Sequence, residues 1–187
     1  MPKARSVAVL VGSLRKASYN RKMALALAKL APETLKLAIV EIGDLPLYNE
    51  DVEAAGAPAA WTRFRGEVKG ADALLFVTPE YNRSVPGCLK NAIDVGSRPY
   101  GSSVFAGKPG AIVSVSPGAI GAFGANHHLR QSMVFLDVPT MQQPEAYIGG
   151  AATLFDDQGN IAVEATRGFM TKFLQAFGAW IEATAKS

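Results

Sequence analysis

The sequence predicts an α/β fold in which helices cover both faces of a parallel sheet. Short runs rich in Val, Ile, Leu and Ala alternate five times with segments of helical periodicity. These runs lack polar alternation, which is typical of strands buried on both faces. Repeated strand–helix alternation favours parallel strands joined by helical crossovers. The 187 residues suit one domain with a sizeable core, so residues 1–187 are expected to form a single unit.

The first half of the chain contains three predicted strands. They are Val7–Val11, Leu35–Ile42 and Ala73–Val77. Met23, Leu27 and Leu30 recur at helical spacing after the first strand, and Pro32 ends that helix. A second helix is predicted from about Ala59 to Lys69. Residues 43–58 between the second strand and that helix are expected to form a loop.

The second half contains the remaining elements. The predicted strands are Ala111–Val115 and Val138–Met141. The predicted helices run from Pro86, a favoured first-turn residue, to about Val95, then over about Ala125–Phe135 and about Val163–Ala185. The polar stretch 156–160, within 153–163, is typical of the turn of a hairpin excursion.

Composition excludes several classes of protein. The net charge is +3, from 19 basic and 16 acidic residues, without a run of like charges. A dedicated nucleic-acid binder has a denser basic stripe. One cysteine, Cys88, allows no internal disulfide, and the apolar run Val7–Val11 is too short for a signal peptide or a membrane span. We therefore expect a cytoplasmic protein with no membrane or nucleic-acid partner.

The turn after the first strand concentrates donors for an anion. The stretch 12–20 places Ser13, Ser18 and Asn20 around the planar guanidinium of Arg15. The amino end of the following helix adds free N–H groups and a favourable dipole. In open parallel sheets, ligands bind beyond the carboxyl ends of the strands, where this turn lies. The alternative is that Ser18 only caps a helix and Arg15 is a solvated charge.

The pattern of these donors favours a single terminal phosphate. The Walker pattern for nucleoside triphosphates is absent, and so is Gly-x-Gly-x-x-Gly after the first strand. A second motif, 79–87 (Pro-Glu-Tyr-Asn-Arg-Ser-Val-Pro-Gly), follows the third strand. In the flavodoxin-like strand order 2-1-3-4-5, strands one and three are neighbours at the switch point, so the two motifs flank one crevice. A phosphate site beside aromatic and amide groups suits a flat ring on a ribityl chain, as in FMN.

With these motifs, the chain resembles the NAD(P)H-dependent FMN reductase family, and most of all its bacterial quinone and chromate reductases. The resemblance rests on Gly-Ser-Leu-Arg-Lys-x-Ser-x-Asn from residue 12 and Pro-Glu-Tyr-Asn-x-Ser-x-Pro-Gly from residue 79. Further matches are 89–94, 106–109, 118–121 and 128–131. The likeness spans about residues 5–148, and beyond Gly149 it is only general.

The resemblance implies roles for particular residues. Those implied to hold the FMN phosphate are Ser13, Arg15, Ser18, Tyr19 and Asn20. Those implied to line the flavin ring are Pro79, Glu80, Tyr81, Asn82 and Arg83, with Ser116 and Gly118 on its other side. It further implies that NADH or NADPH is the electron donor and that quinones are the acceptors, with chromate or other metal oxyanions as a further class of acceptor. The implied mechanism is ping-pong hydride transfer. Family members form dimers or tetramers with flavin sites near subunit boundaries.

For several other residues the sequence gives only weak evidence of a function. Arg83 and Arg98 are candidates for steering anionic substrates, with ordinary surface charge as the alternative. His127 and His128 are neighbours on a helix and point about 100° apart, so they do not form a metal-binding pair, and no metal is expected. We interpret Cys88 as a small packing residue. Glu80 is a possible general base, although hydride transfer requires none.

Two features bear on assembly and on the class of function. Trp61 and Phe64, with the apolar loop 45–48, exceed what a monomer needs to expose, so we expect a homodimer or homotetramer with the loop near a neighbour's flavin. The rival to an enzyme is a flavin-binding redox sensor or an electron carrier. A carrier of the flavodoxin type has an acidic surface, which a net charge of +3 disfavours. The sensor remains an alternative at the level of sequence.

Overall fold

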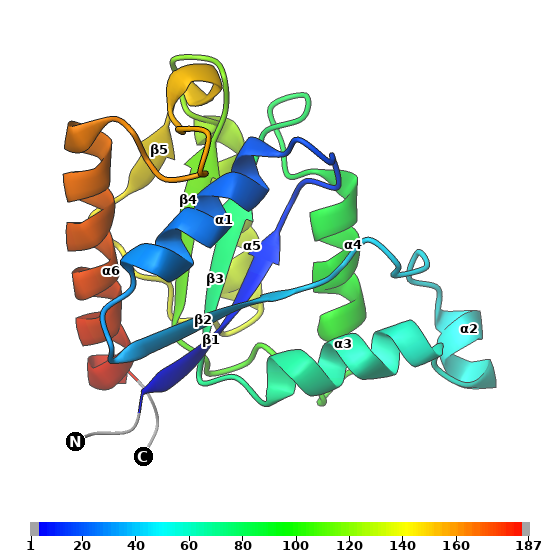
Figure 1. Ribbon diagram of the computed structural model, residues 1–187. Helices are drawn as coiled ribbons and strands as arrows, with labels where there is room; N and C mark the ends of the chain where they lie inside the picture. The colour runs from blue at the N-terminus through cyan, green and yellow to red at the C-terminus, as the bar shows by residue number, and fades with distance from the viewer. Residues whose placement is uncertain (1–3, 185–187) are drawn as a thin grey trace.

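The computed structural model describes residues 4–184, which are built around a five-stranded parallel sheet (Figure 1). Its strand order is β2-β1-β3-β4-β5, as predicted. The strands are β1 (Arg5–Val11), β2 (Leu35–Val40), β3 (Ala73–Thr78), β4 (Gly110–Val115) and β5 (Ala146–Ile148). Strand β1 pairs with β2 on one side and with β3 on the other, so the order reverses at β1. That reversal is the switch point at which open sheets bind ligands.

Helices cover both faces of the sheet because alternate strand residues are apolar on both sides. The helices are α1 (Tyr19–Leu30), α3 (Ala59–Lys69), α4 (Gly87–Gly96), α5 (Phe123–Phe135) and α6 (Glu164–Thr184). Helices α1 and α6 pack against one face, in the cluster that holds Val9 and Leu75. Helices α3, α4 and α5 pack against the other, in the cluster that holds Leu10 and Phe76. Figure 1 shows the sheet between these two layers.

The fifth strand lies later in the chain than predicted. Val138–Met141 was expected to form it, but that segment makes only an isolated bridge between Thr140 and Gly110. Strand β5 is Ala146–Ile148, which pairs with the end of β4. Pro139 has no amide proton to donate to a ladder, which explains why regular pairing does not develop there.

The segment between β2 and α3 contains a short helix that was not predicted. Helix α2 (Glu50–Ala55) begins after Asn49, whose side chain accepts a hydrogen bond from the Asp51 amide. None of its residues is buried. Its anchor is an ion pair between Glu53 and Arg65 of α3, with 2.5 Å between Oε2 and Nη2.

Trp61 and Phe64 are fully buried within this chain, with 0% of the surface of each residue exposed. They pack in the core on the α3 side of the sheet. The expectation that they form part of an exposed apolar surface is therefore wrong. Leu47, in the same expected patch, is 80% exposed.

The end of the chain follows the predicted pattern. A 3₁₀ turn, η1 (Ala151–Thr153), precedes a narrow hairpin in which Phe155 pairs with Ile161. Asp156 accepts hydrogen bonds from the amides of Gln158 and Asn160, which closes the turn. Within residues 4–184, no helix combines the length and the apolar character needed to cross a membrane.

Candidate functional site

Gly12 joins the loop after β1 to the loop after β3. Its amide donates to the Val77 carbonyl oxygen at 2.9 Å. A Cβ at this position would lie 3.1 Å from Thr78 Oγ1 and 3.2 Å from the Pro79 ring. The lack of a side chain thus lets the two loops approach closely. The predicted proximity of the two motifs is confirmed.

The loop after β1 presents polar groups at the amino end of α1. Ser13 is buried and Arg15 is exposed. Ser18 Oγ accepts a hydrogen bond from the Arg21 amide at 3.1 Å, so Ser18 is the N-cap of α1. The capping reading is therefore correct for the Ser18 oxygen, while its hydroxyl proton stays available to a ligand oxygen. No carboxylate in the described part of the chain pairs with Arg15, which leaves its guanidinium free for an anion.

Asn20 connects α1 to the end of β4. Its side-chain Nδ2 donates to the Val115 carbonyl oxygen at 3.2 Å, and the residue is 4% exposed. Its Oδ1 is buried and has no hydrogen-bond partner among residues 4–184. Because the side chain is committed to Val115, the group of Asn20 best placed for a phosphate is its backbone N–H in the first turn of α1.

The loop after β3 is a tight hairpin turn with an unusual backbone. Tyr81 and Ser84 exchange two backbone hydrogen bonds, at 3.1 and 3.0 Å. The central residues, Asn82 and Arg83, have φ values of 50° and 63°. Two successive positive φ values define a type I′ turn, and this conformation is costly for an arginine. Strain of this kind accumulates where function requires a fixed geometry.

Glu80 and Ser84 tie this turn to α5. Glu80 Oε2 accepts a hydrogen bond from the Ala125 amide at 3.1 Å, and its other oxygen lies 3.3 Å from Arg83 Nη1. His128 Nδ1 lies 3.0 Å from Ser84 Oγ. The Glu80 carboxylate is therefore engaged by protein groups, which argues against its being a free general base.

The loop after β4 completes the same edge of the sheet. Ser116 Oγ donates to the Gly118 carbonyl oxygen at 3.1 Å, and the Ser116 amide donates to Ile148 of β5. Gly121 adopts φ 64°, and a Cβ there would meet the Tyr147 backbone at 2.5 Å. The close approaches of Gly121 to Tyr147, and of Gly124 to the turn after β3, are thus contacts within the protein.

Two buried polar residues beneath this loop were not predicted. Ser114 and Asn126 are both 0% exposed. Ser114 Oγ donates to the Gly121 carbonyl oxygen at 2.7 Å, and Asn126 Nδ2 donates to Ser114 Oγ at 3.2 Å. Arg130 in turn donates to Asn126 Oδ1 at 3.1 Å. A serine within an otherwise apolar strand is the only signal of this network in the sequence.

The weaker candidates lie in different places. Cys88 Sγ lies 3.5 Å from the Gly12 carbonyl oxygen, and burial raises the pKa of its thiol, which fits a packing role. His127 lies 2.9 Å from the Tyr147 hydroxyl and beside the ring of Phe123. Burial, followed by the Glu145 carboxylate, raises the pKa of Tyr147 to about 12. Among residues 4–184, no three His, Cys, Asp or Glu side chains gather as metal ligands would.

Arg98 lies away from the other candidates. It follows the carboxyl end of α4, whereas the turn after β3 precedes the amino end of that helix. Ten helical residues span about 15 Å. Its guanidinium lies over the Tyr100 ring, 4.3 Å from the centroid. Within one chain, Arg98 therefore does not share an edge with Ser13 and Tyr81.

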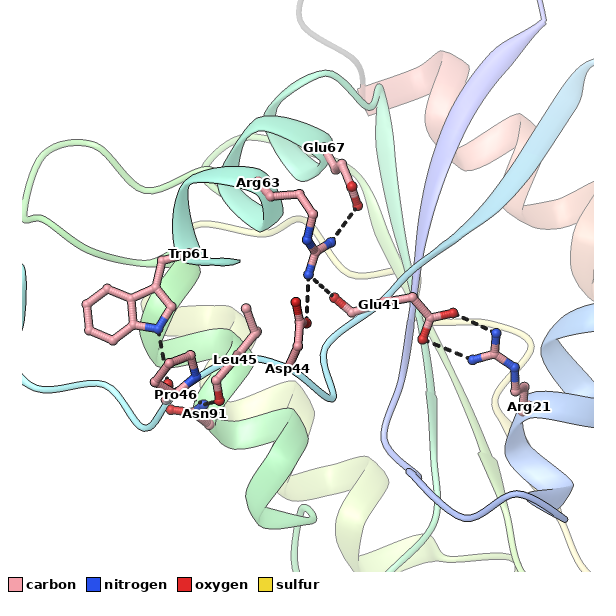
Figure 2. A network of polar contacts seen from close by, with 9 residues as sticks. All are labelled: Arg21, Glu41, Asp44, Leu45, Pro46, Trp61, Arg63, Glu67 and Asn91. Carbon is pink, nitrogen blue, oxygen red and sulfur yellow. Dashed lines mark hydrogen bonds and ion pairs between the residues drawn. The ribbon is translucent and has the colours of Figure 1, made fainter. Parts of the chain in front are cut away.

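The segment after β2 is pinned by a network of polar contacts (Figure 2). Asn91 of α4 donates to the carbonyl oxygens of Leu45 and Pro46 and accepts from the Tyr48 amide, at 3.2, 3.1 and 2.9 Å. Trp61 Nε1 donates to Pro46 at 3.0 Å. These contacts fix the backbone that carries the exposed Leu47. Asn91 was not predicted, although an asparagine on the apolar side of a helix is a usable signal.

The segment after β2 also borders a hollow beside the loop after β1. This cavity of about 530 Å³ is lined by Ser13, Arg15, Arg21 and Glu41 among others. Arg21 and Glu41 form an ion pair at 2.6 Å. The hollow lies on the β2 side of the loop, so it adjoins the predicted phosphate site without reaching the turn after β3.

Comparison with known proteins finds similar sequences and similar structures. A quinone reductase from Pseudomonas putida is 68% identical over 182 residues, which cover 97% of each chain. FerB from Paracoccus denitrificans, a flavoenzyme NAD(P)H:(acceptor) oxidoreductase, has a structure that matches 98% of this chain and 100% of its own with a TM-score of 0.93 at 43% identity. A flavodoxin from Pseudomonas aeruginosa matches 95% of this chain and 99% of its own, with a TM-score of 0.58 at 16% identity, which shows the flavodoxin-like fold alone.

The family model for NADPH-dependent FMN reductases matches residues 5–153, a span that contains β1, β3 and β4 with the polar loop after each. The matched span and the sequence identity to these relatives extend the resemblance well beyond the two loop motifs at 12–20 and 79–87. The chain therefore belongs to the NADPH-dependent FMN reductase family.

Proposed function

We propose that this NAD(P)H-dependent flavin enzyme transfers hydride to quinones, with chromate or other metal oxyanions as a further class of acceptor. The observation that carries the proposal is the junction at Gly12, which brings the Arg15 loop and the Tyr81 turn to one edge of the sheet. The 68% identity to a protein named quinone reductase supports the choice of acceptor. NADH or NADPH supplies the hydride.

The donors at this edge fit the monophosphate of FMN. Arg15 is exposed and unpaired among the described residues, Ser13 and Ser18 bring hydroxyl groups, and Tyr19 and Asn20 begin α1 with free backbone N–H groups. One positive side chain and the positive end of a helix dipole match a single phosphate. FMN supplies the chemistry of accepting and donating a hydride.

The turn after β3 and the loop after β4 fit the flavin ring. In this proposal, one side of the ring is lined by Pro79, Glu80, Tyr81, Asn82 and Arg83, and the other by Ser116 with Gly118. The paired backbone bonds between Tyr81 and Ser84 and the bond from Ser116 to Gly118 support the proposal, because they hold both loops in one conformation. The chain's part is to bind and orient the ring so that a second flat ring stacks on its free face. Arg83, with 74% of its side chain exposed, attracts anionic substrates to this face.

A single open face of the flavin requires donor and acceptor to bind in turn. Initial-rate plots against NAD(P)H at several quinone concentrations should then be parallel, as in ping-pong turnover. Tyr81→Ala should slow reduction and reoxidation alike, since both use the ring that this turn positions. Intersecting plots, or a Tyr81→Ala variant slowed in only one half-reaction, would contradict the shared face.

The enzyme also acts as a homodimer or homotetramer in this proposal. Exposed apolar side chains support it: Leu47, Val134 and Phe135 are 80%, 81% and 72% exposed. Trp61 and Phe64 are not part of this exposed surface, because they are buried in the chain's own core. In such an assembly, Leu47 and its loop lie near a neighbour's flavin, and Arg98 acts on acceptors only from a second chain.

A further inference from the structure

Helix α5 begins without a capping side chain of its own. Its N-cap is Ala122, in the left-handed conformation with φ 59°, and this residue makes no side-chain cap bond. The first amides of a helix need acceptors from elsewhere. Glu80 supplies one: its Oε2 accepts from Ala125, the third residue of α5, at 3.1 Å. A residue of the turn after β3 thus caps the helix that follows β4.

Gly124 makes this contact possible. A Cβ at position 124 would lie 2.9 Å from Glu80 Oε2 and 3.0 Å from the Arg83 carbonyl oxygen. Both distances are shorter than normal non-bonded contacts, so a side chain here would push the turn away from α5. The second residue of α5 therefore lies directly against the turn.

The Glu80 side chain is largely enclosed, with 13% of its surface exposed. Its two oxygens face Ala125 and Arg83, and both of these are donors within the protein. The turn borders the proposed flavin ring on one side, and α5 begins at Phe123, at the end of the loop after β4 that borders it on the other. Glu80 joins the turn to α5.

We propose that Glu80 is a positioning residue that fixes the distance between the turn and α5 and offsets the positive end of that helix. The inference rests on the proposed function, because it concerns the binding of FMN. It assigns the Glu80 side chain to α5, so residue 80 lines the ring through its backbone alone. The carboxylate does not touch the ligand.

The charge of Glu80 has a consequence that a purely mechanical role lacks. The amino end of α5 and the Arg83 guanidinium are both positive, and the carboxylate compensates them. Glu80→Gln retains an oxygen for Ala125 but removes the negative charge. The uncompensated positive field then favours the reduced, more negative flavin, so the midpoint potential of bound FMN should rise.

The test compares five variants with the unchanged chain. Glu80→Ala removes both the acceptor and the charge, whereas Glu80→Gln removes only the charge. Glu67→Gln is the control for charge, because Glu67 is also paired with an arginine, Arg63, but lies on α3. Gly124→Ala is matched by Gly66→Ala, since nothing lies within 4 Å of a Cβ built at Gly66. FMN affinity, amide exchange without flavin and the midpoint potential are measured for each.

Glu80→Ala and Gly124→Ala should each weaken FMN about tenfold, on the scale of one lost bond to a charged group, and both should speed exchange over residues 80–84 and 123–126. Glu80→Gln should weaken FMN less and raise the potential, and both controls should match the unchanged chain. Unchanged FMN affinity in Glu80→Ala would overturn the inference. Weakened FMN affinity with unchanged amide exchange would also overturn it, because Glu80 would then contact the flavin directly. If the unchanged chain fails to bind FMN, the proposed function is wrong, and the exchange data alone still decide whether Glu80 holds the turn.

Discussion

Removing the guanidinium of Arg15 should weaken FMN without affecting riboflavin. Arg15 is exposed and pairs with no carboxylate in the described part of the chain, so Arg15→Ala breaks no internal contact. A hydrogen bond to a charged group contributes about 1.5–3 kcal/mol, and solvent screening at an exposed site favours the lower part of this range. A loss of about 1.5–2 kcal/mol corresponds to roughly a 10- to 30-fold rise in the FMN dissociation constant.

Titration of flavin-free protein by quenching of flavin fluorescence measures both ligands. Arg167→Ala is a matched control, because Arg167 is an exposed arginine on α6. High salt should narrow the difference between Arg15→Ala and the unchanged chain, since screening weakens the phosphate contact. Equal losses for FMN and riboflavin would show that Arg15 does not bind the phosphate and would refute the assignment of the loop.

Three further predictions concern stability and assembly. Asn91→Ala leaves the Leu45 carbonyl oxygen and the Tyr48 amide without this partner, while the Pro46 carbonyl oxygen keeps only Trp61. Unfolding in urea should therefore show a loss of about 2–4 kcal/mol, and a loss below about 0.5 kcal/mol would contradict the role of Asn91. The hydrogen bond from Arg65 lowers the pKa of Glu53 below its usual 4.5, so the pair stabilises the fold above that pH. The difference in stability between the unchanged chain and Glu53→Gln should therefore shrink as the pH falls below 4.5. A difference that stays constant with pH would argue against the pair. Light scattering at micromolar concentration should give a multiple of the 19.7 kDa chain mass, and a monomer mass would reject the assembly.

The strand order and most elements could be predicted because the buried strands are continuous apolar runs. The α3 prediction, Ala59–Lys69, matches the observed bounds. The fifth strand was misplaced because β5 has only three residues, too few for a clear pattern, whereas the four-residue segment Val138–Met141 has an apolar residue at each end. Helix α2 was missed because it is short and buries nothing, although Asn49 and the acidic residues after it were a helix-start signal.

The site could be located from sequence, but its contacts could not. Both polar loops were identified because they follow strands that are adjacent at the switch point. The partner of Glu80 could not be predicted, since it is a backbone amide of a helix 45 residues later in the chain. The burial of Trp61 was misjudged because an apolar helix face packs equally well against its own sheet or against a second chain. Only the tertiary structure distinguishes these cases.

Anaerobic titration of the purified protein tests the central claim most directly. The protein should carry bound FMN, visible as flavin absorbance. NADH or NADPH added without oxygen should bleach this absorbance with one equivalent per flavin, and one equivalent of a quinone should then restore it. A protein that carries no flavin, or a bound flavin that nicotinamide does not bleach or quinone does not restore, would contradict the account.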